Sequence, residues 1–192
     1  MKRSVFLMLF FVAVSCAAQE LKPIKLNAPD LKRTVTLMNA FSNRKSTRTF
    51  SDKMLSHQDL SDLLWAANGI NRPKEGKRTA PSARNKQDIK VYVCIAEGNY
   101  LYNASTSTLD PISKDDVRPM KAPICLILVS DNNESWGALD AGIVSQNISL
   151  FCSGADLATV CRASMNKEEL KKALNLTDKQ TLYLNHPVGY FK

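Results

Sequence analysis

The pattern of apolar and polar residues along the chain predicts four helices. Apolar side chains recur at spacings of three and four, as they do on one side of a helix, in residues 34–44, 56–69, 138–158 and 166–175. In the first of these segments the apolar stripe consists of Val35, Met38 and Phe41. Residues that favour helix ends flank the four segments: Ser56 with Asp59 and Asn166 with Glu169 at starts, and Asn43, Gly69 and Gly154 at ends.

Four further segments have the pattern of strands. Residues 88–96 and 100–105 are joined by Glu-Gly-Asn, which favours a tight turn, so we expect a β-hairpin. Residues 122–130 are apolar throughout, as in a strand covered on both faces, and residues 181–190 form the last strand. The polar residues 71–78 are predicted to form a loop. This order of elements predicts an α+β fold around one sheet.

The N-terminus has the layout of a secretory signal. Lys2 and Arg3 precede an apolar run over residues 5–14, which is too short for a permanent membrane anchor, and small residues follow over 15–18. We predict a signal peptide over residues 1–18, an extended lead-in over 19–33 with two prolines, and one domain over 34–192. The segment AVSC at 13–16 also resembles a lipoprotein attachment site, so a lipid anchor at Cys16 is the alternative to simple cleavage.

The net charge and the spacing of the cysteines limit the classes of ligand that the protein is expected to bind. Loss of Lys2 and Arg3 with the signal lowers the formal net charge of the chain from +8 to +6. A surplus of this size favours an anionic ligand or partner. The alternative is a basic surface that is simply solvated. The remaining cysteines show no Cys-x-x-Cys spacing and lie far from the two histidines, so no metal site is predicted. Cys94 and Cys125 fall in apolar strand segments and are interpreted as buried free thiols, with a disulfide as the alternative in an exported protein.

The stretch NRKSTRTF, residues 43–50, is a candidate anion site. If the backbone is extended, Arg44, Ser46 and Arg48 point to one side, and Lys45 points to the other. Two guanidinium groups and a hydroxyl on one side suit a phosphate, because arginine can donate two parallel hydrogen bonds to it. A solvated basic turn is the alternative.

The stretch APSARNKQ, residues 80–87, precedes a predicted strand. Its small residues let a flat ligand approach the backbone, and Asn85 and Gln87 offer amide donors and acceptors to the edge of a heterocycle. Taken alone, it is an ordinary loop.

Together the two stretches resemble the nitroreductase family of FMN-dependent reductases. The first family motif, Arg-x-Ser-x-Arg-x-Phe, is matched by residues 44–50, and the second, Pro-Ser-x-x-Asn-x-Gln, by residues 81–87. DAGIVSQNISL (140–150) is similar to the family's central helix, LATVCRASM (157–165) to the segment beside the flavin, and HPVGYFK (186–192) to its closing strand.

The resemblance implies an α+β sandwich with a central, mainly antiparallel sheet flanked by helices, which forms a homodimer with FMN at the interface. It assigns the phosphate and ribityl side of FMN to one group of residues and the flavin ring to a second group, from the other subunit, with a backbone N–H as a further donor. The first group is Arg44, Lys45, Ser46, Arg48 and Lys192; the second is Pro81, Ser82, Asn85 and Gln87; the backbone donor is at Ala163 or Ser164. The flavin carries the chemistry, so no catalytic acid–base pair is expected.

The sequence departs from the family pattern at two places. Arg84 stands where many relatives have a small residue, and Cys161-Arg162-Ala163-Ser164 replaces Pro-x-Glu-Gly, so the acidic side chain is absent.

Three classes of function remain open at this point. The first is an exported, periplasmic or envelope-associated oxidoreductase that passes electrons from a reduced small molecule to a nitro, quinone or other organic acceptor. The second is an exported flavin- or ligand-binding protein of the same fold without turnover. The third is a basic domain that binds an anionic polymer; residues 71–78 lack the aromatic residues that nucleic-acid binding would require, so no nucleic-acid partner is expected.

Overall fold

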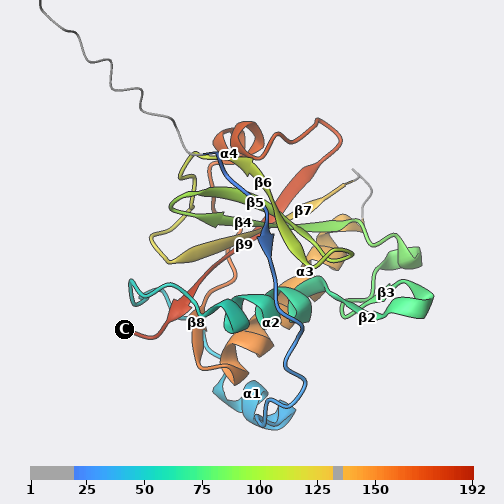
Figure 1. The fold of residues 1–192 in the computed structure, drawn as a ribbon, viewed down its shortest axis with the longest axis vertical. Coiled ribbons are helices and arrows are strands. Elements are labelled where there is room, and N and C mark those ends of the chain that lie inside the picture. Colours follow the sequence, from blue (N-terminus) through green and yellow to red (C-terminus); the bar gives the residue numbers. More distant parts are fainter. Residues whose placement is uncertain (1–19, 132–135) are drawn as a thin grey trace, which may run out of the picture.

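The apolar runs of the sequence form a seven-stranded antiparallel sheet in the computed structural model, which describes residues 20–131 and 136–192 (Figure 1). The strand order is β1-β6-β5-β4-β7-β9-β8, and every neighbouring pair is antiparallel. The strands are β1 Ile24–Lys25, β4 Ile89–Ile95, β5 Gly98–Asn103, β6 Thr108–Ser113, β7 Ile124–Ser130, β8 Leu157–Thr159 and β9 Thr181–Tyr190. The predicted α+β fold around one sheet is confirmed.

The centre of the sheet is covered on both faces. All seven residues of β7 are buried, as predicted for a strand without a polar face. Because successive side chains of a strand point to opposite faces, Leu126 and Leu128 join one core cluster, while Ile127 and Val129 join the other.

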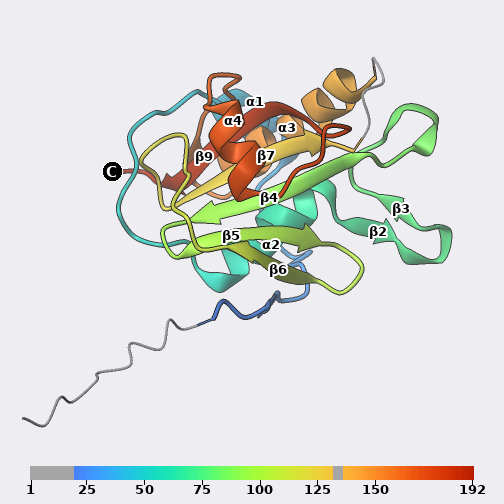
Figure 2. The same cartoon turned by 90° about the horizontal axis from the view of Figure 1, so that it is seen from above.

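The helices are divided between the two faces of the sheet. Helix α2 (His57–Asn68) and helix α3 (Gly137–Gly154) cover one face, α1 (Leu37–Asn43) packs on α3, and α4 (Lys167–Ala173) covers the other face (Figures 1 and 2). The predicted helix caps are present. The Ser56 hydroxyl accepts a hydrogen bond from the Asp59 N–H at 3.0 Å, and the Asn166 side chain accepts one from the Glu169 N–H at 3.3 Å.

Some local predictions were wrong. Residues 71–78 do not form a simple loop, because β2 (Ile70–Arg72) and β3 (Lys77–Arg78) pair as a small hairpin around a 3₁₀ turn at Pro73–Glu75. Strand β6 was missed because it contains Pro111, which has no backbone N–H for a strand ladder, and an irregularity in the β5–β6 register lies beside it. The third helix ends at the predicted stop, Gly154; the helical pattern read as far as residue 158 was wrong beyond it, because residues 157–159 form β8.

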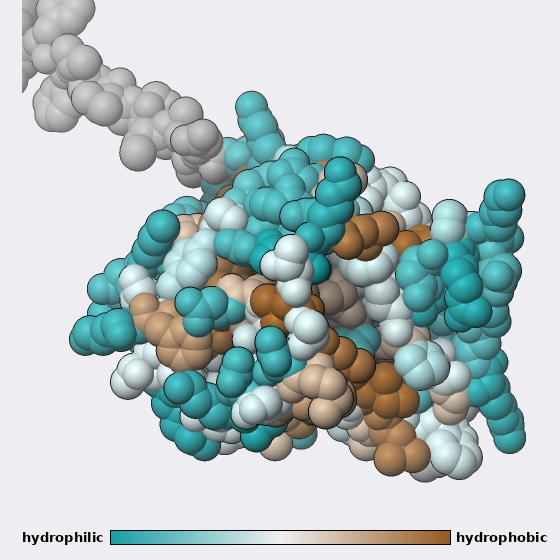
Figure 3. Space-filling model, turned by 90° about the horizontal axis from the view of Figure 1, so that it is seen from below, coloured by the Kyte–Doolittle hydropathy of each residue, from teal (hydrophilic) through white to brown (hydrophobic). Residues whose placement is uncertain are grey.

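The apolar stripe of α1 faces outward. Met38 is 73% exposed and Phe41 is 50% exposed, although their helical spacing alone would suit a buried face. Figure 3 looks onto the face of the molecule that carries α1 and shows apolar side chains gathered there between hydrophilic ones.

The N-terminal predictions fall largely outside the described residues. The predicted signal peptide, residues 1–18, and Cys16 lie wholly outside them. Residues 20–36 lack regular structure except for β1 and one turn, and Arg33 joins this segment to α2 through ion pairs of 2.6 Å with Asp59 and 2.7 Å with Asp62. Of the helices that the structure describes, none combines the length and the apolar character needed to span a membrane.

The four cysteines of the described chain are free thiols. Cys94, Cys125 and Cys152 are buried, and burial raises the pKa of each, whereas Cys161 is exposed. The interpretation of Cys94 and Cys125 as buried free thiols is confirmed. In residues 20–131 and 136–192, no group of three or more His, Cys, Asp or Glu side chains gathers as a metal site would require.

We predict that His186 makes the stability of the fold depend on pH. Its imidazole is fully buried, and burial lowers its pKa from 6.5 to about 4. Between these values the unfolded chain binds a proton that the native state excludes, so the free energy of unfolding falls as the pH falls from about 6.5 to about 4, by about 3 kcal/mol in total.

Urea unfolding of the wild type and of His186→Asn across this pH range measures the effect. The variant is expected to lose that part of the pH dependence, whatever its stability at neutral pH. The exposed His57→Asn is the control and should retain the wild-type dependence. Identical pH dependence in His186→Asn and the wild type would contradict the prediction.

Candidate functional site

Two backbone hydrogen bonds fix the course of the cationic stretch that follows α1. The Thr47 N–H donates to the Thr159 carbonyl at 2.8 Å, and the Ser51 N–H donates to the Tyr190 carbonyl at 2.9 Å. The stretch therefore lies beside β8 and the end of β9, next to the C-terminus of the chain (Figure 1).

The cationic side chains of this region are exposed. Arg44, Lys45, Ser46, Arg48 and Lys192 are all on the surface. The Lys45 ammonium lies 5.3 Å from the centre of the Phe191 ring, which brings the stretch next to Lys192. Within the described part of the chain, no ion pair joins these cations to a carboxylate. Their charge is therefore available to an anionic ligand.

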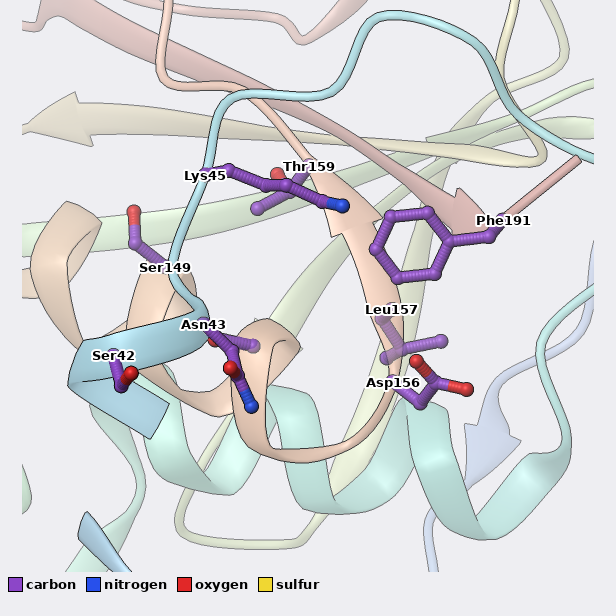
Figure 4. Close-up of a pocket in the computed structure, with 9 residues that line it drawn as sticks. Ser42, Asn43, Lys45, Ser149, Asp156, Leu157, Thr159 and Phe191 are labelled. Atoms are coloured by element: carbon purple, nitrogen blue, oxygen red, sulfur yellow. The ribbon is translucent and has the colours of Figure 1, made fainter. Parts of the chain in front are cut away.

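A polar pocket of about 610 Å³ adjoins the stretch. In Figure 4, Lys45 reaches over the pocket toward Phe191, and Asp156 lies on the opposite side from Lys45. Of the residues predicted to bind a cofactor, Lys45 alone lines this pocket; the alternation along an extended chain explains why Arg44, Ser46 and Arg48 do not. The lining residues are Ser42, Asn43, Lys45, Ser149, Ser153, Asp156, Leu157, Thr159 and Phe191.

The second stretch forms a strained loop that a buried carboxylate holds in place. Arg84, Asn85 and Gln87 have left-handed φ values of 51°, 56° and 51°, which side chains other than glycine rarely adopt. Both carboxylate oxygens of Asp140, in the first turn of α3, lie 3.0 Å from the Ala83 nitrogen and accept its N–H. Such a conformation persists only when surrounding contacts determine it, so Asp140 positions this loop.

Asp140 has a second carboxyl group beside it. Both Asp140 and Asp88 are buried, and Asp88 directly follows the loop. Burial and the neighbouring Asp88 raise the pKa of Asp140, while the Ala83 N–H opposes the shift. The Ser130 hydroxyl donates to Asp88. The sequence reasoning missed Asp140, although an acidic residue in the first turn of a predicted helix was a signal.

The amides of Asn85 and Gln87 have different environments. The Gln87 side-chain oxygen accepts from Arg78 Nε at 2.9 Å, and its nitrogen donates to the Gly76 carbonyl at 2.8 Å and to Asn85 Oδ1 at 3.2 Å. The side-chain nitrogen of the exposed Asn85 has no partner among the described residues. Gln87 therefore supports the loop, and Asn85 can donate to a ligand.

The other two predicted residues of this stretch lie at its start. Pro81 is exposed, and the half-buried Ser82 hydroxyl accepts from the Gln87 N–H at 2.8 Å. Ser82 therefore also braces the loop from within.

The segment after Cys161 is bound to β9 through Asn185. Arg162 and Asn185 exchange two backbone hydrogen bonds of 2.9 and 2.7 Å, and the Asn185 amide donates to the carbonyls of Arg162 and Ser164, each at 3.1 Å. The residue next to such a hydrogen-bonded pair turns its N–H away from the partner strand. The N–H of the exposed Ala163 therefore points away from β9, and Ser164 is also exposed.

The structure does not bring the two stretches together within one chain. Asp140, which holds the 81–87 loop, is in the first turn of α3, whereas Ser149 and Ser153, which line the polar pocket, are near its end. Asp140 and Ser153 are thirteen positions apart along the helix, which corresponds to about 20 Å. Figures 1 and 2 agree, because the C-terminus and the β2–β3 hairpin lie at opposite ends of the molecule in both views.

Comparisons with known proteins found matches over most of the chain. The family model described as "Nitroreductase family" matches residues 41–190. The crystal structure of a nitroreductase-like protein of Ralstonia eutropha matches this fold with a TM-score of 0.84. The two sequences are 32% identical, and the match covers 88% of this chain and 90% of that one. A nitroreductase-like protein of Methanocaldococcus jannaschii is 24% identical over 86% of this chain and 96% of its own length.

A more distant structure shares the fold. A Parabacteroides distasonis protein described as an NADH dehydrogenase/NAD(P)H nitroreductase is 21% identical, with a TM-score of 0.56 over 80% of this chain and 86% of that one.

We predict that Gln87→Ala destabilises the folded chain by about 1–3 kcal/mol, because it removes hydrogen bonds that brace the strained loop. The control is Arg84→Ala, which changes a residue with the same left-handed φ of 51° but no side-chain hydrogen bond in the described structure. Urea unfolding at neutral pH measures both variants. Equal destabilisation by the two substitutions would contradict the bracing role of Gln87.

Proposed function

The chain belongs to the nitroreductase family, and we propose that it is an FMN-dependent oxidoreductase that acts as a homodimer. The proposal rests on one observation. The residues predicted to bind the phosphate of FMN and those predicted to bind its ring lie near opposite ends of α3. A flavin that contacts both sets would take one of them from a second subunit.

Helix α1 supplies a surface on which a second subunit can pack. Leu37, Met38 and Phe41 are 63%, 73% and 50% exposed, and an apolar pocket of about 500 Å³ opens between this helix and α2 and α3. Stable interfaces bury about 800 Å² on each partner around an apolar centre, which an exposed apolar helix supplies. Because α1 ends at Asn43, a second subunit on this helix would lie next to the cationic stretch.

The residues of the cationic region fit the phosphate of FMN. Arg44, Lys45, Arg48 and Lys192 present charge without a carboxylate partner in the described chain. The hydroxyls of Ser149 and Ser153 already donate to backbone carbonyls at 2.9 and 2.8 Å, so their oxygens remain as acceptors for the ribityl hydroxyls. Charge-assisted hydrogen bonds from arginine are about twice as strong as neutral ones, so the cations dominate the affinity.

Two donors of the protein fit the polar edge of the flavin ring. One is the Asn85 amide of one subunit, and the other is the Ala163 N–H, which points away from β9. FMN, when bound, supplies the electron-transfer chemistry between a reduced donor and an acceptor. Both groups are held by neighbouring hydrogen bonds, so they can stabilise negative charge without reorganising.

We propose a reduced nicotinamide as the donor class and nitro, quinone or related organic compounds as the acceptors. The descriptions of its relatives support this choice, since one distant structural relative is described as an NAD(P)H nitroreductase. We further propose that the protein is exported, on the basis of residues 1–18. Mass spectrometry of the N-terminus in the native envelope distinguishes cleavage after Ala18 from a lipid anchor at Cys16.

We predict that the chain binds one FMN per subunit only as a dimer. Met38→Glu places a charge on the exposed stripe of α1 and is expected to yield a monomer that loses FMN. Lys172→Glu, on α4 at the opposite face of the sheet, is the control and should remain dimeric and loaded. Sedimentation and flavin absorbance measure both properties, and a monomer with stoichiometric FMN would disprove the shared site.

A turnover assay then tests the enzyme itself. The loaded dimer should reduce a nitroaromatic compound with NAD(P)H, while a loaded dimer that fails with every donor and acceptor would favour a binding protein without turnover.

We predict that Asn85→Ala lowers the reduction potential of bound FMN while FMN stays bound, since the phosphate contacts lie elsewhere. A donor that favours the reduced flavin by about 1.4 kcal/mol corresponds to a shift of about 30 mV for two electrons. Asn85→Asp should lower the potential further, because it adds a negative charge. A redox titration measures both, and an unchanged potential in both variants would remove Asn85 from the ring edge.

A further inference from the structure

A small cavity of about 210 Å³ adjoins the β2–β3 hairpin. Its lining comes from the end of α2, from β3 and β4, and from the end of β5 with the turn that follows it. The polar side chains around it include Arg78 of β3, Lys90 of β4 and Tyr102 of β5, and no carboxylate of the described chain lines it. The cavity is therefore a place where an anion meets donors and no repelling charge.

The guanidinium of Arg78 is half-buried and has no carboxylate partner among the described residues. Its Nε donates to Gln87 Oε1 at 2.9 Å, and its Nη1 donates to the Asn68 carbonyl at 2.7 Å. Both acceptors are neutral, and they use two of the five N–H donors that a guanidinium carries. Charges that are removed from water are normally paired with an opposite charge, so this cation has room for an anionic partner.

Tyr102 supplies a further donor in the same cavity. Its hydroxyl has no hydrogen-bond partner in the part of the chain that the structure describes. Burial raises the pKa of Tyr102 to about 12, although the nearby Arg78 opposes the shift, so the hydroxyl keeps its proton at neutral pH and can donate it. Burial also lowers the pKa of Arg78, and the nearby Tyr102 opposes that shift in turn.

The third polar group is already neutralised. Lys90 pairs with Asp131 at 3.1 Å, so its charge is balanced within the protein. Of the two cations that line the cavity, Arg78 is the one that lacks a partner in the described chain.

We propose that this cavity binds a small oxyanion, a phosphate or carboxylate group, through the Arg78 guanidinium and the Tyr102 hydroxyl. Arginine suits either group, because its planar donors can form two parallel hydrogen bonds with two oxygens of one anion. Pockets for drug-sized ligands occupy about 300–1,000 Å³, so this smaller cavity suits a small anion or the anionic end of a larger molecule. It is distinct from the cationic stretch, because Gln87 belongs to the loop at the opposite end of α3.

The cavity is connected to the loop that carries Asn85. Gln87, which accepts from Arg78, donates to Asn85 Oδ1 at 3.2 Å. A bound anion would hold the guanidinium, and through it the Gln87 side chain, in one position. It would also add negative charge on the side of the proposed flavin contact, which disfavours the reduced flavin. This consequence rests on the function proposed above, whereas the anion site does not.

The test is calorimetric titration of inorganic phosphate, and separately of acetate, into FMN-free protein at neutral pH. The protein carries Arg44→Ala and Arg48→Ala, so that the cationic stretch does not contribute a second site. We expect one anion to bind per subunit, and the tighter of the two identifies the preferred group. Binding of neither anion at millimolar concentrations would overturn the proposal.

Variants in the same background locate the site. Tyr102→Phe removes only the hydroxyl and should weaken binding at least about tenfold, and Arg78→Met should abolish it. The matched control is Arg72→Met, which removes an exposed cation of the same hairpin that does not line the cavity and should keep the affinity. An affinity that Tyr102→Phe leaves unchanged would overturn the proposal, as would equal weakening by Arg72→Met and Arg78→Met.

A redox titration of FMN-loaded protein with and without phosphate tests the link to the loop. Phosphate should lower the reduction potential of the wild type and leave that of Tyr102→Phe unchanged. An unchanged potential in the wild type would retain the anion site and reject its link to the flavin. A protein that holds no FMN would reject the function proposed above and leave the calorimetric test unaffected.

Discussion

The packing of α3 against the sheet is the constraint on which the rest of this structure depends. Val144 and Ile148 of this helix lie in the same core cluster as Leu126 and Leu128 of β7, so the helix cannot shift without opening the core. A helix of 18 residues is also rigid along its axis. Its two ends therefore hold the 81–87 loop and the polar pocket at a fixed separation, which is the basis of the proposal that two chains share the site.

Apart from a short 3₁₀ turn at Ala83–Asn85, the loops of the site lie outside the helices and strands, and single polar contacts with the core determine their positions. The Thr159 carbonyl of β8 holds the cationic stretch, the Asp140 carboxylate holds the 81–87 loop, and the Asn185 amide holds the segment after Cys161. Each of these groups belongs to an element whose apolar residues fix it in the core. A rigid scaffold thus positions irregular segments whose outward groups remain available to a ligand.

The sequence predicts those helices and strands whose local pattern of apolar residues matches their burial in the fold. The strand over residues 122–130 is buried on both faces, and its unbroken apolar run shows this directly. Strand β6 was not predictable in this way because Pro111 contradicts its position in the sheet. The exposure of Met38 was equally unpredictable, because helical spacing shows that an apolar stripe exists but not which other element covers it.

The residues of the candidate site were likewise only partly predictable from the sequence. Family motifs name Asn85 and Gln87 together, but only the three-dimensional arrangement shows that Arg78 and Gly76 already engage Gln87. The contribution of Asp140 depends on a contact across 57 residues of sequence, which no local pattern reveals.

Strand β9 carries the clearest sign that its sequence serves more than stability. Asn185 and His186 are adjacent, both are fully buried, and Asn185 Oδ1 has no hydrogen-bond partner in the described structure. An unpaired buried carbonyl costs about 1–3 kcal/mol, so an apolar pair at these positions would stabilise the sheet more. The two side chains instead tie β9 to the segments on either side of Cys161, through Thr159 and Arg162. The strand thus keeps an unpaired buried carbonyl at a position where the same side chain orients the backbone after Cys161.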